Sequence, residues 1–212
     1  PAPEPALSRP DEGVDLLDLR GLSGMVEYEP DEYTFTALAG TPVATVQAEL
    51  AKHGQYLPFD PPLAAEGATL GGTVAAGMSG AGRMRYGGVR DFVVGVRWVD
   101  GTGEIIRGGG KVVKNAAGFD FPKLFVGSLG RLGVLVEMTF KVFPAPVARV
   151  TCGIDCRDLN DAVERMNFLC NQSWEVEAME LRVGGEAPQL LVRFMGDEPA
   201  LTKRAELAIE QS

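Results

Sequence analysis

The stretch that decides the fold reads Gly67-Ala-Thr-Leu-Gly-Gly-Thr-Val-Ala-Ala-Gly-Met-Ser-Gly80, in which almost every side chain is small. Glycine is needed where the backbone takes a positive φ or comes close to a ligand. Small side chains leave backbone N–H groups uncovered, and successive uncovered N–H groups can bind phosphate oxygens. We expect a helix to start at Leu70 or Gly71, which would place a helix N-terminus beside such an anion. On glycine content alone, a structural loop is as good an interpretation as a ligand site.

The glycine surplus of the chain is concentrated around this stretch. The sequence has 27 glycines among 212 residues, and 18 of them lie between Gly67 and Gly133. The stretch lacks both the Gly-Lys-Ser/Thr of a Walker loop and the Gly-x-Gly-x-x-Gly of a Rossmann turn. The pattern therefore favours a backbone-defined site of another kind.

The composition excludes several classes of function. A formal net charge of -9 argues against nucleic acid as a partner, because phosphate binding needs clustered Lys and Arg. No stretch approaches the roughly 20 apolar residues of a membrane span. We expect Cys152, Cys156 and Cys170 to be reduced thiols. A metal site is not expected, because the single histidine, His53, lies far upstream of these cysteines.

Strands and helices alternate in the first two thirds of the chain. A helix is expected with Thr41 as N-cap and Pro42 at its first position, with Val43, Val46 and Leu50 inward and Gly54 at its end. The other expected elements are strands over 25–30, 33–38, 93–99, 104–107 and 133–143 and a short helix over 119–125, the strands over 93–99 and 104–107 forming a hairpin.

The pattern changes after Pro144-Ala-Pro146, which we interpret as a linker because two close prolines interrupt helix and strand alike. Strands are expected over 148–154, 177–183 and 189–194, and helices over 158–170 and 199–209. Asp158 is expected to cap the first helix, whose inward residues would be Leu159, Ala162, Val163, Met166 and Leu169. This β-α-β-β-α order predicts the start of a ferredoxin-like α+β unit.

Further motifs accompany the glycine stretch in a fixed order. They are Gly40-Thr-Pro42, Leu57-Pro-Phe-Asp-Pro-Pro62, Thr69-Leu-Gly-Gly72, the segment from Arg85-Tyr-Gly87 to Asp91, Gly109-Gly-Lys-Val-Val-Lys-Asn-Ala-Ala-Gly-Phe-Asp120 and Lys123-Leu-Phe-Val-Gly-Ser-Leu-Gly-Arg-Leu-Gly-Val134. This succession, from about Asp18 to Pro146, resembles the FAD-binding domain of the vanillyl-alcohol-oxidase (PCMH-type) flavoproteins. Within that family the chain is similar to the FAD-binding subunits of bacterial glycolate oxidases.

The resemblance implies an α+β fold with two domains. Residues 1–146 would form the PCMH-type FAD-binding domain, and residues 147–212 part of a ferredoxin-like cap domain. The family's first glycine loop is expected upstream of Leu16, where this sequence has no such stretch. We therefore expect the first lobe to be truncated here and to lack its phosphate loop.

The resemblance also implies which residues bind the cofactor. The family holds the FAD pyrophosphate with backbone amides of two glycine loops, and the second loop matches residues 67–80. Pro61 and Pro62 match the run along the flavin or its ribityl chain, and Val134 matches a backbone position at the adenine end. The expected cofactor-binding residues are Pro61, Pro62, Gly67, Ala68, Thr69, Gly71, Gly72, Gly77, Ser79, Gly80, Tyr86, Gly87 and Val134. Many relatives have asparagine at the position of Gly77, so its side-chain hydrogen bond would be missing here.

Other residues are assigned structural roles. We expect His53 to be an exposed surface residue and FAD to be bound non-covalently. Asp91 is interpreted as a loop-stabilising carboxylate and Asp120 as a helix N-cap. Met78, Met84 and Trp98 are expected to be packing residues. Lys111 and Lys114 could sense the flavin or a substrate carboxylate, and solvated lysines are an equally good interpretation.

The resembled complexes oxidise a 2-hydroxy acid such as glycolate with two related FAD-binding subunits and an iron–sulfur subunit. The resemblance therefore implies an FAD-dependent oxidoreductase subunit whose partners are a catalytic flavoprotein subunit and the iron–sulfur subunit. No histidine follows His53, so we expect no substrate-oxidising base and no catalysis by this chain alone. A cytoplasmic location is expected, with peripheral association with the inner membrane through partners left open. The alternatives are a cofactor-free scaffold subunit and the flavin domain of a reductase such as UDP-N-acetylenolpyruvoylglucosamine reductase.

Overall fold

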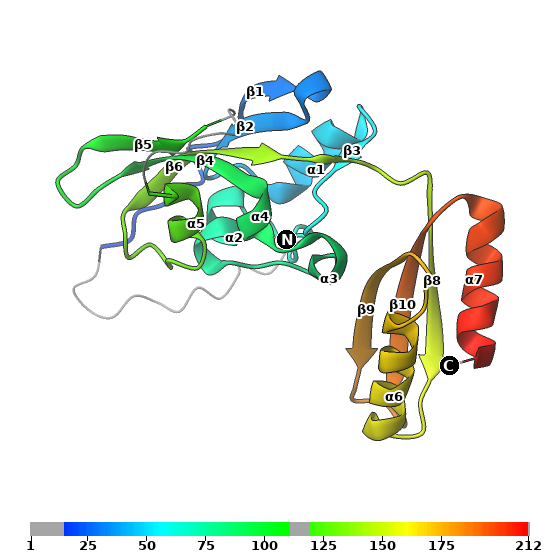
Figure 1. The fold of residues 1–212 in the computed structure, drawn as a ribbon. Helices are drawn as coiled ribbons and strands as arrows, with labels where there is room; N and C mark the ends of the chain where they lie inside the picture. Colours follow the sequence, from blue (N-terminus) through cyan, green and yellow to red (C-terminus); the bar gives the residue numbers. More distant parts are fainter. Residues whose placement is uncertain (1–14, 111–118, 212) are drawn as a thin grey trace. The chain divides into compact units, whose positions relative to one another are not determined.

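The computed structural model describes residues 15–110 and 119–211, and the chain divides into two compact units (Figure 1). Unit 1 comprises Pro1–Leu57, Pro61–Met78 and Val89–Phe143. Unit 2 comprises Pro58–Asp60, Ser79–Gly88 and Pro144–Ser212. Two short segments from the first half of the chain thus belong to the unit formed mainly by the C-terminal third. Within the described ranges, no helix has the length and apolar character that a membrane crossing requires.

Unit 1 is built on a five-stranded antiparallel sheet with the order β1-β2-β6-β4-β5. Its strands are β1 (Met25–Glu29), β2 (Thr34–Leu38), β4 (Val93–Val99), β5 (Ile105–Gly109) and β6 (Val134–Lys141). The 3-10 helix η1 (Pro30–Glu32) joins β1 to β2, and the short strands β3 (Gln55–Tyr56) and β7 (Phe143–Pro144) pair with each other. The expected strand pair around the Pro-Asp turn and the expected hairpin of β4 and β5 are confirmed.

Helices α2 (Leu70–Ala76), α4 (Val89–Phe92) and α5 (Phe121–Phe125) pack against this sheet, and α1 (Val43–Ala51) packs against β3. Phe35 and Phe140 face each other across β2 and β6 with stacked rings 5.3 Å apart, and both are fully buried. Trp98 is buried against Phe121 and Phe125, which confirms its packing role.

The expected start of the first helix is wrong by one position. Pro42, not Thr41, occupies the N-cap of α1, and no side chain caps this end. The Thr41 hydroxyl is buried and instead bonds the backbone of Gly24 and of Leu38, 2.9 and 2.7 Å away. Because Thr41 lies where the chain leaves β2, its hydroxyl is used to tie that turn to the segment before β1.

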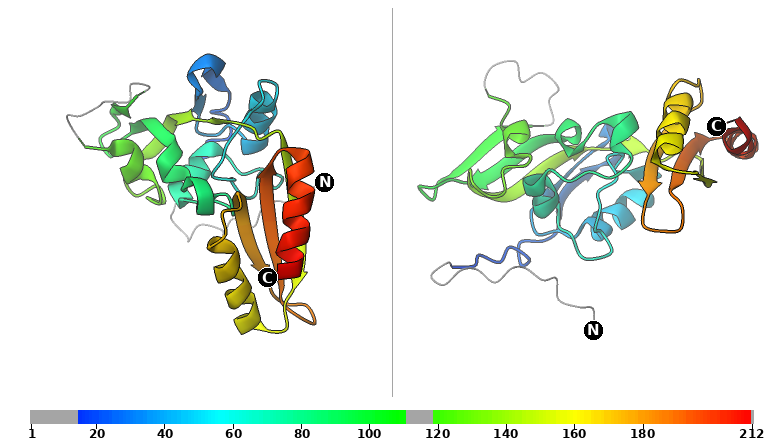
Figure 2. Two further views of the ribbon diagram at one scale, coloured as in Figure 1. Left: turned by 45° about the vertical axis from the view of Figure 1, so that its right-hand side comes forward. Right: turned by 90° about the horizontal axis from the view of Figure 1, so that it is seen from below.

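Unit 2 contains a three-stranded antiparallel sheet with the order β8-β10-β9. Its strands are β8 (Ala148–Asp155), β9 (Val176–Arg182) and β10 (Gln189–Gly196), and its helices are α3 (Arg83–Tyr86), α6 (Leu159–Cys170) and α7 (Glu198–Gln211). Leu190, Val192 and Phe194 of β10 form a core with buried residues of α6 and α7. Both helices lie beside this sheet in Figure 2. The expected β-α-β-β-α order is confirmed.

Helix α6 begins as expected, but its buried face is narrower. Asp158 caps it by accepting a hydrogen bond from the Asp161 N–H at 2.9 Å. Ala162 and Leu169 are buried, whereas Leu159 and Val163 are 56% and 52% exposed. The helix is therefore turned so that the stripe of Ala162 and Leu169 faces the sheet, and the inward placement of Leu159 and Val163 is wrong.

Two methionines were also placed wrongly. Met78 and Met84, expected to be packing residues, are 38% and 46% exposed. Both lie at the surface of glycine-rich segments, whose small neighbours provide little apolar surface to cover a methionine side chain.

The start of α6 leads to a prediction about acid stability. Arg157 and Arg165 bond the Asp161 carboxylate at 2.9 and 3.1 Å, and the hydrogen bonds from Arg157 above all hold the pKa of Asp161 well below its ordinary value. A carboxyl group with a depressed folded-state pKa stabilises the protein at neutral pH, and this contribution is lost as the pH falls through that range. Asp161→Asn should therefore lower the urea midpoint at pH 7, and its difference from the wild type should shrink as the pH falls below about 4.

The matched control is Glu164→Gln, which removes an exposed carboxylate from the same helix. Its urea midpoint should follow that of the wild type across the pH range. A gap between Asp161→Asn and the wild type that is equally large at pH 7 and pH 2.5 would contradict the ionic explanation.

Candidate functional site

The glycine stretch folds into helix α2 and the turns on either side of it. The helix starts at Leu70, as expected, and Thr69 caps it by accepting a hydrogen bond from the Gly72 N–H at 3.2 Å. Gly77 ends the helix in the left-handed region at φ 66°. Glycine and asparagine are the residues that adopt this C-terminal conformation most readily. An asparagine at this position in relatives is therefore compatible with the same turn.

Two N–H groups at the start of α2 are already bonded within unit 1. Leu70 N–H donates to the Thr41 carbonyl at 3.0 Å, and Gly71 N–H donates to the Ala39 carbonyl at 2.8 Å. A Cβ at Gly71 would lie 2.9 Å from the Cβ and the carbonyl oxygen of Ala39. Glycine at position 71 is thus required for packing of α2 against the end of β2.

Gly67 and Gly72 are less tightly packed than Gly71. A Cβ at Gly67 would meet no atom of the described structure within 4 Å, although its φ of +86° itself favours glycine. A Cβ at Gly72 would meet only the Thr69 hydroxyl, at 3.2 Å. Gly72 is exposed inside the first turn of a helix, where alanine would be about 1 kcal/mol more favourable. A methyl group at position 72 would require the Thr69 hydroxyl to shift by a few tenths of an ångström, and the backbone conformation of Gly72 does not itself require glycine.

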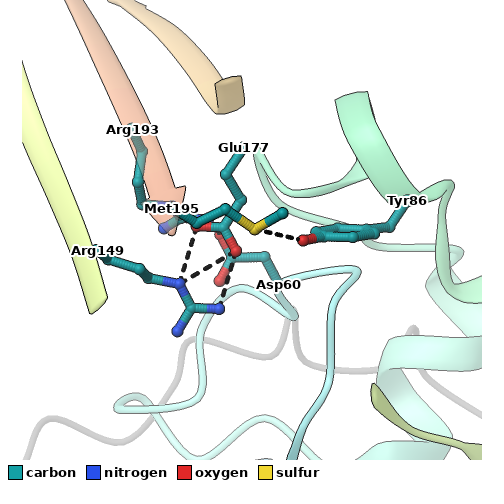
Figure 3. Close-up of polar contacts among 6 residues, drawn as sticks. All are labelled: Asp60, Tyr86, Arg149, Glu177, Arg193 and Met195. Carbon is teal, nitrogen blue, oxygen red and sulfur yellow. Dashed lines mark hydrogen bonds and ion pairs between the residues drawn. The ribbon is translucent and has the colours of Figure 1, made fainter. Parts of the chain in front are cut away.

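Ser79, Gly80, Tyr86 and Gly87 belong to unit 2 and lie on its segment Ser79–Gly88. Gly80 N–H donates to the carbonyls of Phe59 and Asp60, at 3.0 and 2.8 Å. A Cβ at Gly80 would lie 2.3 Å from the Asp60 carbonyl oxygen, so the two segments can touch only through glycine. The Tyr86 hydroxyl points toward β10, 2.8 Å from the Met195 sulfur, and is not free to face a ligand in this arrangement (Figure 3).

Four charged residues of unit 2 form a connected network that the sequence did not reveal (Figure 3). Glu177 is 1% exposed and accepts hydrogen bonds from Arg149 at 2.8–3.1 Å. Arg193 Nε lies 2.9 Å from the same carboxylate, at an angle that makes no hydrogen bond, and its Nη2 donates to Asp60 at 2.8 Å. Burial opposes the charge of Arg193, but the bond to Asp60 and the charges of Asp60 and Glu177 raise its pKa.

A known protein family matches a large part of the first half of this chain. Residues 7–109 match the family model of the FAD binding domain. The expected resemblance to the PCMH-type FAD-binding family is thereby confirmed. FAD is the cofactor that this family model describes, and the fold class expected from the sequence is confirmed.

Relatives of this chain include two glycolate oxidase subunits. It is 48% identical over 145 residues to glycolate oxidase subunit GlcE of Escherichia coli K12, covering 68% of this chain and 41% of that protein. It is 33% identical over 142 residues to subunit GlcD of Bacillus subtilis 168, covering 67% of this chain and 30% of that protein. The chain thus spans less than half the length of either relative.

The fold also occurs among solved structures. Alkyldihydroxyacetonephosphate synthase superposes with a TM-score of 0.73 at 20% identity, over 90% of this chain and 40% of that one. The superposed region extends beyond Pro146. At 20% identity this likeness concerns the fold alone.

The remaining expectations have mixed outcomes in the FAD-binding chain. Asp120 caps α5 by accepting a hydrogen bond from the Lys123 N–H, as expected. His53 is exposed, as expected, and its ring meets the edge of Tyr28 at 5.1 Å. Lys111 and Lys114 lie outside the described residues. Of the other predicted cofactor residues, Pro61 is buried, and Pro62, Ala68 and Val134 are partly exposed. Within the described ranges, no group of three or more His, Cys, Asp or Glu side chains could hold a metal ion.

Proposed function

We propose that the chain is the FAD-binding part of a glycolate-oxidase-like 2-hydroxy-acid dehydrogenase complex, where it holds FAD non-covalently and supports electron transfer. The observation that carries the proposal is the 48% identity to glycolate oxidase subunit GlcE over the region that includes the glycine stretch. Bound flavin would supply the redox chemistry, and the protein would bind and orient it.

The residues present fit such a cofactor. Gly72 leaves the first turn of α2 uncovered on its exposed side, and a Cβ at Gly67, in the turn before it, would meet nothing within 4 Å. We propose that backbone around Gly67, Thr69 and Gly72 receives the pyrophosphate, with Gly71, Gly77 and Ala68 shaping this segment. Pro61 and Pro62 would lie along the flavin and Val134 near the adenine end. Ser79, Gly80, Tyr86 and Gly87 are also proposed to contact FAD, and they belong to unit 2.

The chain is proposed to act with partners and not to oxidise the substrate alone. Its sequence contains one histidine, the exposed His53, which packs beside Tyr28. A 2-hydroxy acid must lose a proton from its hydroxyl, and histidine is the side chain that most often serves as such a base. We therefore propose a catalytic flavoprotein subunit and an iron–sulfur subunit as partners. Residues 1–146 are proposed as the FAD-binding domain and residues 147–212 as part of the cap domain.

A second candidate is a scaffold subunit that keeps the fold without holding the cofactor. One observation favours it: Leu70 and Gly71 N–H groups are already bonded to carbonyl oxygens of unit 1. The N–H groups of Gly67, Ala68 and Gly72 are bonded as well, to Ala64, Leu63 and Thr69, which leaves few amides at the start of α2 for a pyrophosphate.

Gly72→Ala separates the two candidates. The added methyl group would occupy the open side of α2, so we expect the Kd for FAD to rise at least tenfold. Alanine favours the helix by about 1 kcal/mol, which offsets a small shift of the capping Thr69 hydroxyl, so the melting temperature should change little. The measurement is a titration of FAD fluorescence quenching, together with thermal unfolding of the protein without FAD.

The matched control is Gly101→Ala, because Gly101 lies in the β4–β5 turn and a Cβ there meets nothing within 4 Å. It should leave both the FAD affinity and the melting temperature unchanged. Equal FAD affinity of Gly72→Ala and the wild type would remove the pyrophosphate from this helix.

A further inference from the structure

The face of the unit 2 sheet opposite α6 and α7 holds residues that the helices do not cover. On β10, Leu190, Val192 and Phe194 point into the helix-covered core. Successive side chains of a strand point to opposite faces, so Arg193 and Met195 lie on the other face. Both contact segments from the first half of the chain: Arg193 bonds Asp60, and Met195 accepts from Tyr86 (Figure 3). Helix α3 also contacts β9.

A β-bulge brings Glu177 to this face. Arg193 is paired with Ala178 and Phe194 with Val176, so Glu177 is an extra residue on β9 without a partner on β10. A bulge of this kind re-aims a side chain at a defined position of the sheet. Val176 and Met179 both pack with the helix-covered core, on either side of the bulge. The bulge therefore allows a buried carboxylate to reach Arg149 and Arg193 while β9 keeps its apolar side chains on the core.

Asp60 is held from two directions. Its carboxylate accepts from Arg193 at 2.8 Å, and its carbonyl accepts from the Gly80 N–H, also at 2.8 Å. Its φ is +54°, a conformation that is uncommon for residues other than glycine and that surrounding contacts must maintain. A Cβ at Gly82 would lie 2.4 Å from the Pro58 carbonyl oxygen, so the segments Pro58–Asp60 and Ser79–Gly88 are in direct backbone contact.

These two segments border residues that we propose to contact FAD. Asp60 immediately precedes Pro61 and Pro62, and its carbonyl partner is Gly80. A carboxylate fixed by a buried charge network would hold the Asp60 backbone in its strained conformation. Loss of the fixing charge would let this segment relax and change the course of the chain into Pro61.

We propose that Arg193, oriented by the buried Glu177, is a positioning residue for the flavin site: it holds Asp60, and with it the contact between Pro58–Asp60 and Ser79–Gly88. This inference rests on the proposed function, because it assigns to residues of the β9–β10 pair a role in FAD binding. None of these charged side chains has to touch the cofactor.

The test is a double-mutant cycle with Asp60→Asn, Arg193→Met and the double variant. Two readouts are measured: amide hydrogen exchange of the Gly80 N–H in the protein without FAD, and the Kd for FAD from fluorescence quenching. Each single variant should exchange Gly80 at least tenfold faster and bind FAD at least fivefold more weakly. The double variant should be no worse than Arg193→Met, because the two side chains act through one contact.

Two further variants separate positioning from general damage. Arg193→Lys keeps the charge and should restore part of the Gly80 protection. Arg182→Met removes an exposed arginine from the neighbouring strand and should change neither readout.

Each outcome has one meaning. Unchanged Gly80 exchange in both single variants overturns the inference, as does a double variant whose effects on FAD affinity simply add. Faster exchange with unchanged FAD affinity overturns the positioning role while the proposed function stands. If the wild type binds no FAD, both the proposed function and the role of Arg193 in flavin binding are wrong. The exchange data would still show whether Arg193 keeps Asp60 in contact with Gly80.

Discussion

Glu177→Ala should destabilise unit 2 by about 2–3 kcal/mol, below the ~3–5 kcal/mol typical when a fully buried pair is broken. Glu177 is 1% exposed, and without its carboxylate Arg149 and Arg193 would face each other across the bulge. Both arginine side chains keep partial access to water, at 35% and 27% exposure, which limits the cost. The measurement is urea unfolding followed by circular dichroism.

Glu180→Ala is the control for this experiment, because Glu180 is an exposed carboxylate on the same strand. A surface substitution of this kind changes stability by no more than about 0.5 kcal/mol. Equal unfolding free energies for the two variants would mean that the buried network contributes nothing beyond surface charge.

Gly80→Ala should destabilise the protein by about 1–3 kcal/mol, as overpacked sites do, and should weaken FAD binding at the same time. The new Cβ would lie 2.3 Å from the Asp60 carbonyl oxygen, so one of the two segments must move. Because that atom is backbone, no side-chain rotation relieves the clash. Thermal unfolding and FAD fluorescence titration measure the two effects.

The contrast with Gly72→Ala sharpens this prediction. Both substitutions add one methyl group to the same glycine stretch, but the new Cβ would meet a backbone oxygen at 2.3 Å at position 80 and a side-chain hydroxyl at 3.2 Å at position 72. Gly80→Ala should therefore lower the melting temperature, whereas Gly72→Ala should not. A Gly80→Ala protein as stable as the wild type would show that the contact with Asp60 is loose in solution.

Local signals in the sequence account for what was predicted correctly. Asp158 precedes an apolar helical stripe and caps α6, and Asp120 caps α5 in the same way. The Asp100-Gly101-Thr102-Gly103 turn forms the β4–β5 hairpin, with the Asp100 carboxylate accepting from the Thr102 N–H at 2.8 Å. Each of these features depends on residues close together in the chain, so their spacing alone is informative.

Features that depend on tertiary contacts were not predictable. The Thr41 hydroxyl bonds Gly24, seventeen residues upstream, and so does not cap α1. Helix α6 packs on the sheet through Ala162 and Leu169, and this tertiary contact leaves Leu159 and Val163 exposed. The Glu177 network joins residues from β8, β9, β10 and the Asp60 turn, and its bulge appears only when β9 is paired with β10.

The glycine stretch was predicted in part. Its composition predicted α2 and an open backbone around it, and Gly72 fits that prediction. The sequence could not separate Gly72 from Gly71 and Gly80, which are glycines because Ala39 and Asp60 lie against them. Which glycines pack against the protein becomes visible only in three dimensions.

The most direct test of the central claim is the visible absorption spectrum of the purified protein after incubation with FAD and desalting. It is measured on this chain and on a form extended upstream to include the expected first glycine loop. We predict that flavin bands are retained after desalting, and that their intensity in the extended form corresponds to about one FAD per chain. Gly72→Ala should reduce these bands, whereas Gly101→Ala should not. Loss of the flavin bands from both wild-type forms would contradict FAD binding and favour the scaffold subunit.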